Sequence, residues 1–99
     1  MIEIKPWMIG DERFLGVLIY LPKVTMRMLV NMKMICLDEC FNLHQIEKRC
    51  SVPLIRCSSG SFEKMMNQPC KEISVSAKNL GIHESMSVKE AVACVFQQK

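Results

Sequence analysis

The sequence is poor in glycine and in aromatic residues, and it has no long apolar run. Four glycines, one tryptophan, one tyrosine and four phenylalanines occur among 99 residues, which excludes glycine-rich low-complexity structure and an aromatic stacking surface for nucleic acid. The longest apolar run, at residues 14–21, is far shorter than the roughly 20 residues of a membrane-spanning helix. Glu3 lies where a secretory signal peptide carries basic residues. We therefore expect a cytoplasmic protein without a membrane segment.

Motifs that hold cofactors or phosphates are missing as well. The six cysteines form no Cys-x-x-Cys pair, and no glycine-rich loop has the spacing of a nucleotide-binding site. The net charge is only +3, and basic residues are scattered rather than gathered into the stripe that binds nucleic acid. The sequence therefore predicts no cofactor and no nucleic-acid partner.

Apolar residues, by contrast, are abundant for so short a chain. They make up 49% of the sequence, yet a domain of this length buries only about two thirds of the surface that its unfolded chain exposes. Residues 14–21 are apolar on both faces of a predicted strand, and the chain's own helices can cover only one face. We therefore expect a homo-oligomer in which a neighbouring subunit covers the other face. The residues assigned to this interface are Phe14, Val17, Leu18, Ile19, Tyr20, Met26 and Met28.

Short β-branched and alternating segments predict a strand-rich first half of the chain. Pro6 limits the pairing of the first strand. Pro53 indicates that the last strand either lies at a sheet edge or begins at this residue. Turns are expected at residues 10–12 and 31–33. The expected strands cover residues 1–6, 14–21, 25–30, 34–37 and 52–57.

Capping residues predict helices in the second half. Asn42 caps a short helix at residues 43–49, Ser61 caps a helix that breaks near Asn67, and Ser87 with Glu90 forms the capping box of a final helix.

A main helix is expected between the last two of these helices. Met66, Cys70, Ile73, Ala77 and Leu80 recur at steps of four and three. The pattern predicts a helix that starts at Pro69 and stops at Gly81.

These elements predict a single α+β domain at residues 1–99, with a strand-rich association region at 1–37 and a mixed, helix-rich region at 38–99. The C-terminal helices should pack on one face of a mainly antiparallel sheet of about five strands.

Four segments also resemble a known family. Residues 21–25 (Leu-Pro-Lys-Val-Thr), 62–66 (Phe-Glu-Lys-Met-Met), 77–82 (Ala-Lys-Asn-Leu-Gly-Ile) and 86–91 (Met-Ser-Val-Lys-Glu-Ala) occur in the same order in the YunC-like domain of unknown function, which is found in bacteria and archaea. The resemblance covers nearly the whole chain. It implies an α/β fold whose N-terminal strands form a tetramerisation region, so the resemblance implies that the expected homo-oligomer is a tetramer. It implies no activity. The stretch 36–40 departs from the family because it lacks the family's glycine after the fourth strand.

We expect a binding or regulatory module, and the alternative is a thiol-dependent or metal-assisted small enzyme. Cys36, Cys40 and His44 are spaced by four residues and would share a face on one continuous helix, as zinc ligands can, with Cys50 or Cys57 as the fourth ligand. The change from a strand pattern to a helix pattern between them argues against convergence.

Reactive thiols are the other source of chemistry. Cys70 follows Pro69 at the expected start of the main helix, where backbone N–H groups favour a thiolate. It is the first candidate nucleophile and Cys36 is the second. The competing interpretation of Cys70 is a small apolar filler on the same stripe as Met66 and Ile73.

Overall fold

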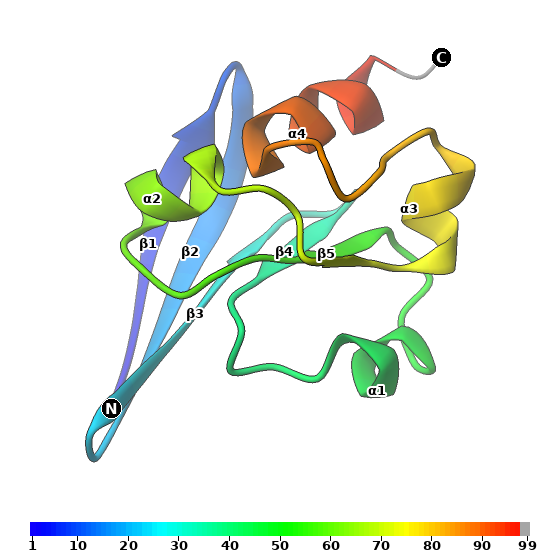
Figure 1. Cartoon of the computed structure of the whole chain (residues 1–99). Coiled ribbons are helices and arrows are strands. Elements are labelled where there is room, and N and C mark those ends of the chain that lie inside the picture. The colour runs from blue at the N-terminus through cyan, green and yellow to red at the C-terminus, as the bar shows by residue number, and fades with distance from the viewer. Residues whose placement is uncertain (98–99) are drawn as a thin grey trace.

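Residues 1–97 are described by a computed structural model, a six-stranded sheet with helices on both faces (Figure 1). The strand order follows the chain order, and only β4 and β5 are parallel. The predicted α+β fold with a mainly antiparallel sheet is confirmed, with one strand more than expected. The strands are β1 (Ile2–Ile9), β2 (Glu12–Leu21), β3 (Val24–Val30), β4 (Ile35–Leu37), β5 (Leu54–Arg56) and β6 (Glu72–Ile73), and the helices are α1 (Leu43–Glu47), α2 (Phe62–Asn67), α3 (Val75–Asn79) and α4 (Val88–Phe96).

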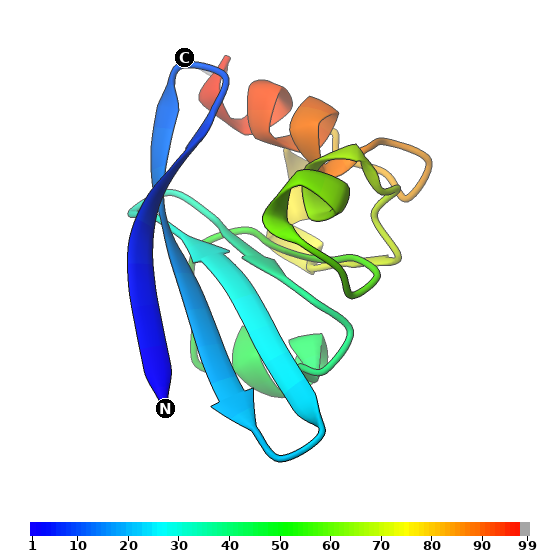
Figure 2. The same cartoon turned by 90° about the vertical axis from the view of Figure 1, so that its left-hand side faces the viewer.

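Strands β1, β2 and β3 form an antiparallel meander whose far end projects beyond the helices (Figure 2). Gly10, with φ of +60°, makes the left-handed turn between β1 and β2. Strand β1 runs through Pro6 to Ile9, three residues further than predicted. Because Pro6 lies at a position whose nitrogen points away from β2, its missing N–H removes no hydrogen bond from the sheet.

The turn between β3 and β4 is closed by an asparagine side chain. Asn31 Oδ1 accepts hydrogen bonds from the backbone N–H groups of Lys33 at 2.9 Å and Met34 at 3.0 Å. This Asx-type turn needs no glycine, so the predicted turn at 31–33 forms without one.

The main core lies between the sheet and the C-terminal helices, with α2 and α4 over the meander (Figure 2). Phe62 packs so closely on Gly16 that a Cβ there would lie 2.7 Å from the ring. The longest helix described in residues 1–97, α4, has nine residues, and none is long and apolar enough to cross a membrane. The largest fully buried side chains of this core are Phe14, Leu29, Met34, Ile55, Met65 and Val88.

A second, smaller cluster lies on the opposite face, beneath α1. Leu43 of α1 is fully buried against Leu37 of β4 and Leu54 of β5. Phe41, just before the N-cap, and Ile46, at the fourth helical position, both pack against the same cluster, and this is the spacing of a hydrophobic staple. The chain therefore covers both faces of the sheet at β4 and β5, but only one face of the meander.

The predicted main helix at residues 69–80 is wrong. Residues 71–73 instead extend along β5, where the N–H of Lys71 donates to the carbonyl of Arg56 at 2.7 Å and Ile73 pairs with Ile55. The two residues before them pair with the segment that precedes α4, where the N–H of Cys70 donates to the carbonyl of Met86 at 2.8 Å. The helix begins only after its N-cap Ser74. The free edge of β5 offers these residues backbone partners, and that pairing overrides the apolar periodicity.

Candidate functional site

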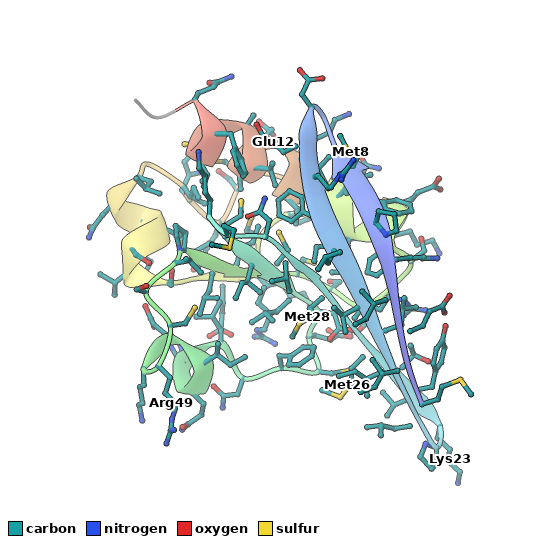
Figure 3. The ribbon with its side chains drawn as sticks, turned by 180° about the vertical axis from the view of Figure 1, so that it is seen from behind. Met8, Glu12, Lys23, Met26, Met28 and Arg49 are labelled. Carbon is teal, nitrogen blue, oxygen red and sulfur yellow. The ribbon has the colours of Figure 1, made fainter. Side chains whose placement is uncertain are left out.

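Strands β1, β2 and β3 carry a continuous apolar surface on the face opposite α2 and α4 (Figure 3). The pairing register places Ile4, Val17 and Met28 in one row across the three strands. Successive residues of a strand point to opposite faces, so every second residue joins this surface. The apolar residues of this surface, the open face, are Ile2, Ile4, Pro6, Met8, Leu15, Val17, Ile19, Leu21, Val24, Met26, Met28 and Val30. Arg13, opposite Met8, lies at the end of the same face.

The margins of the open face are exposed to solvent in the single chain, and its central residues, Val17, Ile19, Met26, Met28 and Val30, are half-buried. Ile2 is 64% exposed, Ile4 61% and Leu15 50%. Helix α1 covers only its margin, where Met28 packs against the second cluster. Scattered apolar residues are normal on a surface, but a contiguous apolar sheet face marks a site of interaction.

Three residues of the predicted interface lie on the face of the sheet that carries the main core, and not on the open face. Phe14 is 0% exposed and Leu18 6%, because both point into the main core under the C-terminal helices. Tyr20 lies on that same side of the sheet, and its hydroxyl donates to Glu3 at 2.7 Å.

The other four residues of the predicted interface lie on the open face. These residues are Val17, Ile19, Met26 and Met28. Sequence reasoning missed the contribution of β1, although the alternation of Ile2 and Ile4 with Glu3 and Lys5 was the signal.

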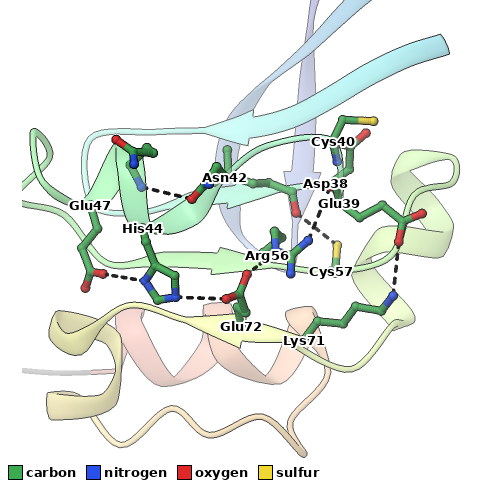
Figure 4. A network of polar contacts seen from close by, with 12 residues as sticks. Asp38, Glu39, Cys40, Asn42, His44, Glu47, Arg56, Cys57, Lys71 and Glu72 are labelled. Carbon is green, nitrogen blue, oxygen red and sulfur yellow. Dashed lines mark hydrogen bonds and ion pairs between the residues drawn. The ribbon is translucent and has the colours of Figure 1, made fainter.

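A polar cleft of about 370 Å³ lies at the carboxyl ends of β4 and β5, and Figure 4 shows the side chains around it. Strands β4 and β5 are parallel, so the loops that follow them leave the sheet at the same edge, a usual position for ligand sites. The cleft is lined by Glu39, Cys40, Phe41, Asn42, His44, Arg56 and Glu72.

Polar side-chain contacts join three elements around the cleft. Glu72 of β6 accepts from Arg56 Nε at 2.5 Å, and its other oxygen lies 3.0 Å from Nε2 of His44 on α1. Glu47 lies 3.4 Å from the second ring nitrogen of His44 and accepts from the N–H of Val75 at 2.6 Å. The Val75 N–H lowers the pKa of Glu47. Helix α1 is thus tied to β6 and α3.

The loop after β4 is held by a buried carboxylate. Asp38 is 0% exposed, and its oxygens accept from the N–H groups of Arg27 at 2.8 Å and Cys40 at 2.9 Å. Lys71 pairs with Glu39 at 3.2 Å and lowers the pKa of that carboxyl. The charges of the cleft therefore have partners within the chain, and they connect strands and loops that are distant in sequence.

The three predicted metal ligands do not converge. Cys36 points into the main core, whereas Cys40 and His44 line the cleft. Among residues 1–97, no group of three His, Cys, Asp or Glu side chains could hold a metal ion. The other two proposed ligands are also separated, because Cys57 belongs to the main core and Cys50 packs beside α1.

The candidate nucleophiles lie in the core. Cys70 is 2% exposed and sits before β6, not at a helix start. Burial, with Glu90 and Glu84 nearby, raises its pKa to about 11. Burial also raises the pKa of Cys36 well above its ordinary value. Both environments disfavour the thiolate, so they fit the interpretation of these thiols as core residues.

Comparisons with known proteins bear on the fold. No family model and no curated protein matches the sequence. The chain is similar to the crystal structure of a protein of unknown function, TA1206 from Thermoplasma acidophilum, with a TM-score of 0.83 and 16% identity over 96% of this chain and 93% of that chain. At this identity the likeness shows a shared fold and no more.

Proposed function

We propose that this protein is a homo-oligomeric binding or regulatory module whose copies associate through the open face. The observation that carries the proposal is the exposed, continuous apolar surface of β1, β2 and β3. The sheets of two copies can stack about 10 Å apart, so that each copy buries the open face of the other. The flexible side chains of Met26 and Met28 suit an interface between twisted sheets, because they fill irregular gaps.

A single charge at the centre of the open face tests this proposal. Val17 lies between Ile4 and Met28 in the pairing register, so Val17→Glu would bury a carboxylate in the proposed interface. We expect the wild type to have a native mass that is a multiple of the chain mass, and Val17→Glu to have the mass of one chain.

The matched control is Val75→Glu, because Val75 is 63% exposed on α3, away from the sheet face. This variant should keep the wild-type mass in light scattering. A wild type that is a single chain at micromolar concentration would refute the proposal.

Two further assignments accompany it. The cytoplasm suits a chain in which no two of the six cysteines, all within the described residues, form a disulfide. Membership of the YunC-like family is supported by the run at residues 77–82, which ends α3 at Gly81, and by the run at 86–91, which starts α4. An experimental structure of a YunC-like protein with a different strand order would exclude that membership.

A further inference from the structure

The outer edge of β1 is a second surface on which another chain can pair. Met1 and Tyr20 exchange two backbone hydrogen bonds, at 2.8 and 3.3 Å, and bonding alternates along an antiparallel strand. The N–H and C=O groups of Ile2, Ile4 and Met8 therefore point away from β2. Figures 1 and 2 show the N-terminal half of β1 at the margin of the sheet, with no helix beside it.

We propose that β1 pairs antiparallel with β1 of a second copy, in the register that places Ile4 opposite Ile4. This inference rests on the proposed function, because it supplies the second of the two interfaces that a tetramer needs. The chemistry is strand addition, in which backbone hydrogen bonds hold the partner and side chains set its register.

The side chains of β1 distinguish this register from its neighbours. Glu3 and Lys5 lie on the same face of β1, two residues apart. Centring the pair on Ile4 places each Glu3 opposite a Lys5 of the other copy. Centring it on residue 3 opposes two glutamates, and centring it on residue 5 opposes two lysines, which is destabilising.

Pro6 limits the pairing to the first six residues. A pair centred on Pro6 would oppose two nitrogens that carry no hydrogen, in the middle of the ladder. In the register centred on Ile4, the Pro6 carbonyl accepts from the N–H of Ile2 of the other copy, and the missing N–H falls at the end of the ladder.

The same register joins the two open faces. Ile4 meets Ile4, and Ile2 meets Pro6 of the other copy, so the apolar surface continues from one chain to the next. Two such edge-paired dimers can stack through their joined open faces, which gives four copies with both interfaces satisfied.

Charge reversal tests the pairing. Glu3→Lys opposes lysine to lysine, and Lys5→Glu opposes glutamate to glutamate. Each change should raise the dissociation constant of the tetramer into open-face dimers about tenfold, so that on dilution dimers appear at about tenfold higher protein concentration than in the wild type. An equimolar mixture of the two variants should restore the tetramer, with both variants in each edge pair by native mass spectrometry.

Two controls separate the charge effect from local damage. Tyr20→Phe removes the hydrogen bond to Glu3 without changing charge, and Glu84→Lys changes an exposed loop charge away from β1. Both should remain tetrameric. If the tetramers of Glu3→Lys and Lys5→Glu dissociate at the same protein concentration as the wild-type tetramer, edge pairing is wrong and the open-face proposal stands. A monomeric wild type rejects both.

Cysteine substitution measures the register directly. Residues opposite each other in a hydrogen-bonded pair have Cα atoms about 5.5 Å apart, within the range of a disulfide. With oxidised glutathione as the oxidant, Ile4→Cys should form a covalent dimer that the wild type, with its native cysteines, does not form. Faster dimers from Glu3→Cys or Lys5→Cys than from Ile4→Cys would overturn the proposed register.

Discussion

At the scale of single residues, the buried polar side chains described in residues 1–97 hold backbone N–H groups. Asp38 and Ser74 are these residues, and each accepts hydrogen bonds from two separate segments. Ser74 Oγ accepts from the N–H of Leu54 in β5 at 3.0 Å and from that of Ala77 in α3 at 3.2 Å. This one hydroxyl thus caps α3 and accepts the hydrogen bond of a buried strand N–H. Because both N–H groups are buried, water cannot replace the hydroxyl as their acceptor.

Ser74→Ala should therefore lower the free energy of unfolding more than the loss of a helix cap alone. We expect a loss of about 2–4 kcal/mol, because a cap contributes about 1 kcal/mol and an unsatisfied buried N–H costs about 1–3 kcal/mol. Urea denaturation measures it. The control is Ser87→Ala, which removes the α4 cap from a less buried residue and should cost about 1 kcal/mol. Equal losses would contradict the double role of Ser74.

Thiol reactivity is a second prediction at the residue scale. Cys40 is exposed, whereas Cys57 and Cys70 are buried, and burial raises their pKa values to about 12 and about 11. At pH 7.5, iodoacetamide should label Cys40 well before Cys57 or Cys70, as mass mapping would show. Labelling of Cys70 in the native protein faster than in urea would revive the thiol-enzyme hypothesis.

At the scale of elements, local signals predicted the capped helices well. Asn42, Ser61 and Ser87 each cap a helix as expected, because the capping interactions lie within four residues of sequence. The main helix failed for the opposite reason. Residues 71–73 gain backbone partners from β5, about 15 residues earlier in the chain, and residues 69–70 gain them from residues 86–87, later in the chain. Single-sequence periodicity carries no information about such pairing.

The polar cleft was missed for a related reason. Arg56 and Glu72 meet only because β5 and β6 are neighbours, and nothing in their local sequence distinguishes them from surface charges. His44 and Cys40 were identified by spacing, but the interactions of His44 are with carboxylates that bind α1 to the rest of the fold.

The attachment of α1 through Glu47 should depend on pH. The folded-state pKa of Glu47 lies below its ordinary value of 4.5, chiefly because of the Val75 N–H, so the native state binds this proton less readily than the unfolded chain. The contribution of the ionised Glu47 carboxylate to the free energy of unfolding is complete above the ordinary pKa. It disappears as the pH falls through the folded-state pKa. The Tm of Glu47→Gln should be below that of the wild type at pH 7, and the difference should shrink toward pH 3.

The control for this change is Glu84→Gln, which alters an exposed loop carboxyl. Its Tm should follow the wild type closely at pH 7. A Glu47→Gln difference that stays constant from pH 7 to pH 3 would mean that the ionised carboxylate does not stabilise α1.

At the scale of the whole molecule, composition predicted an excess of apolar surface but not its position. Strand β2 is apolar on both faces, so its sequence cannot show which face the helices cover. The structure decides this through Gly16, which admits the ring of Phe62 and thereby turns Phe14 and Leu18 toward the core. Val17 and Ile19 then lie on the open face.

If the open face is buried between copies, the thermal stability of the protein must depend on its concentration. An oligomer that dissociates on unfolding gains stability by mass action, so the Tm of the wild type should rise as the concentration increases from 1 to 100 μM (about 100-fold). At the high concentration, the Tm of Val17→Glu should be lower than that of the wild type. It should not change with concentration, because the copies of this variant do not associate. Val75→Glu should retain the concentration dependence. A contradicting result would be a native mass of several chains with a wild-type Tm that is constant over this range. The copies would then stay joined in the unfolded ensemble or separate before unfolding. In either case, the open face would contribute nothing to folding stability.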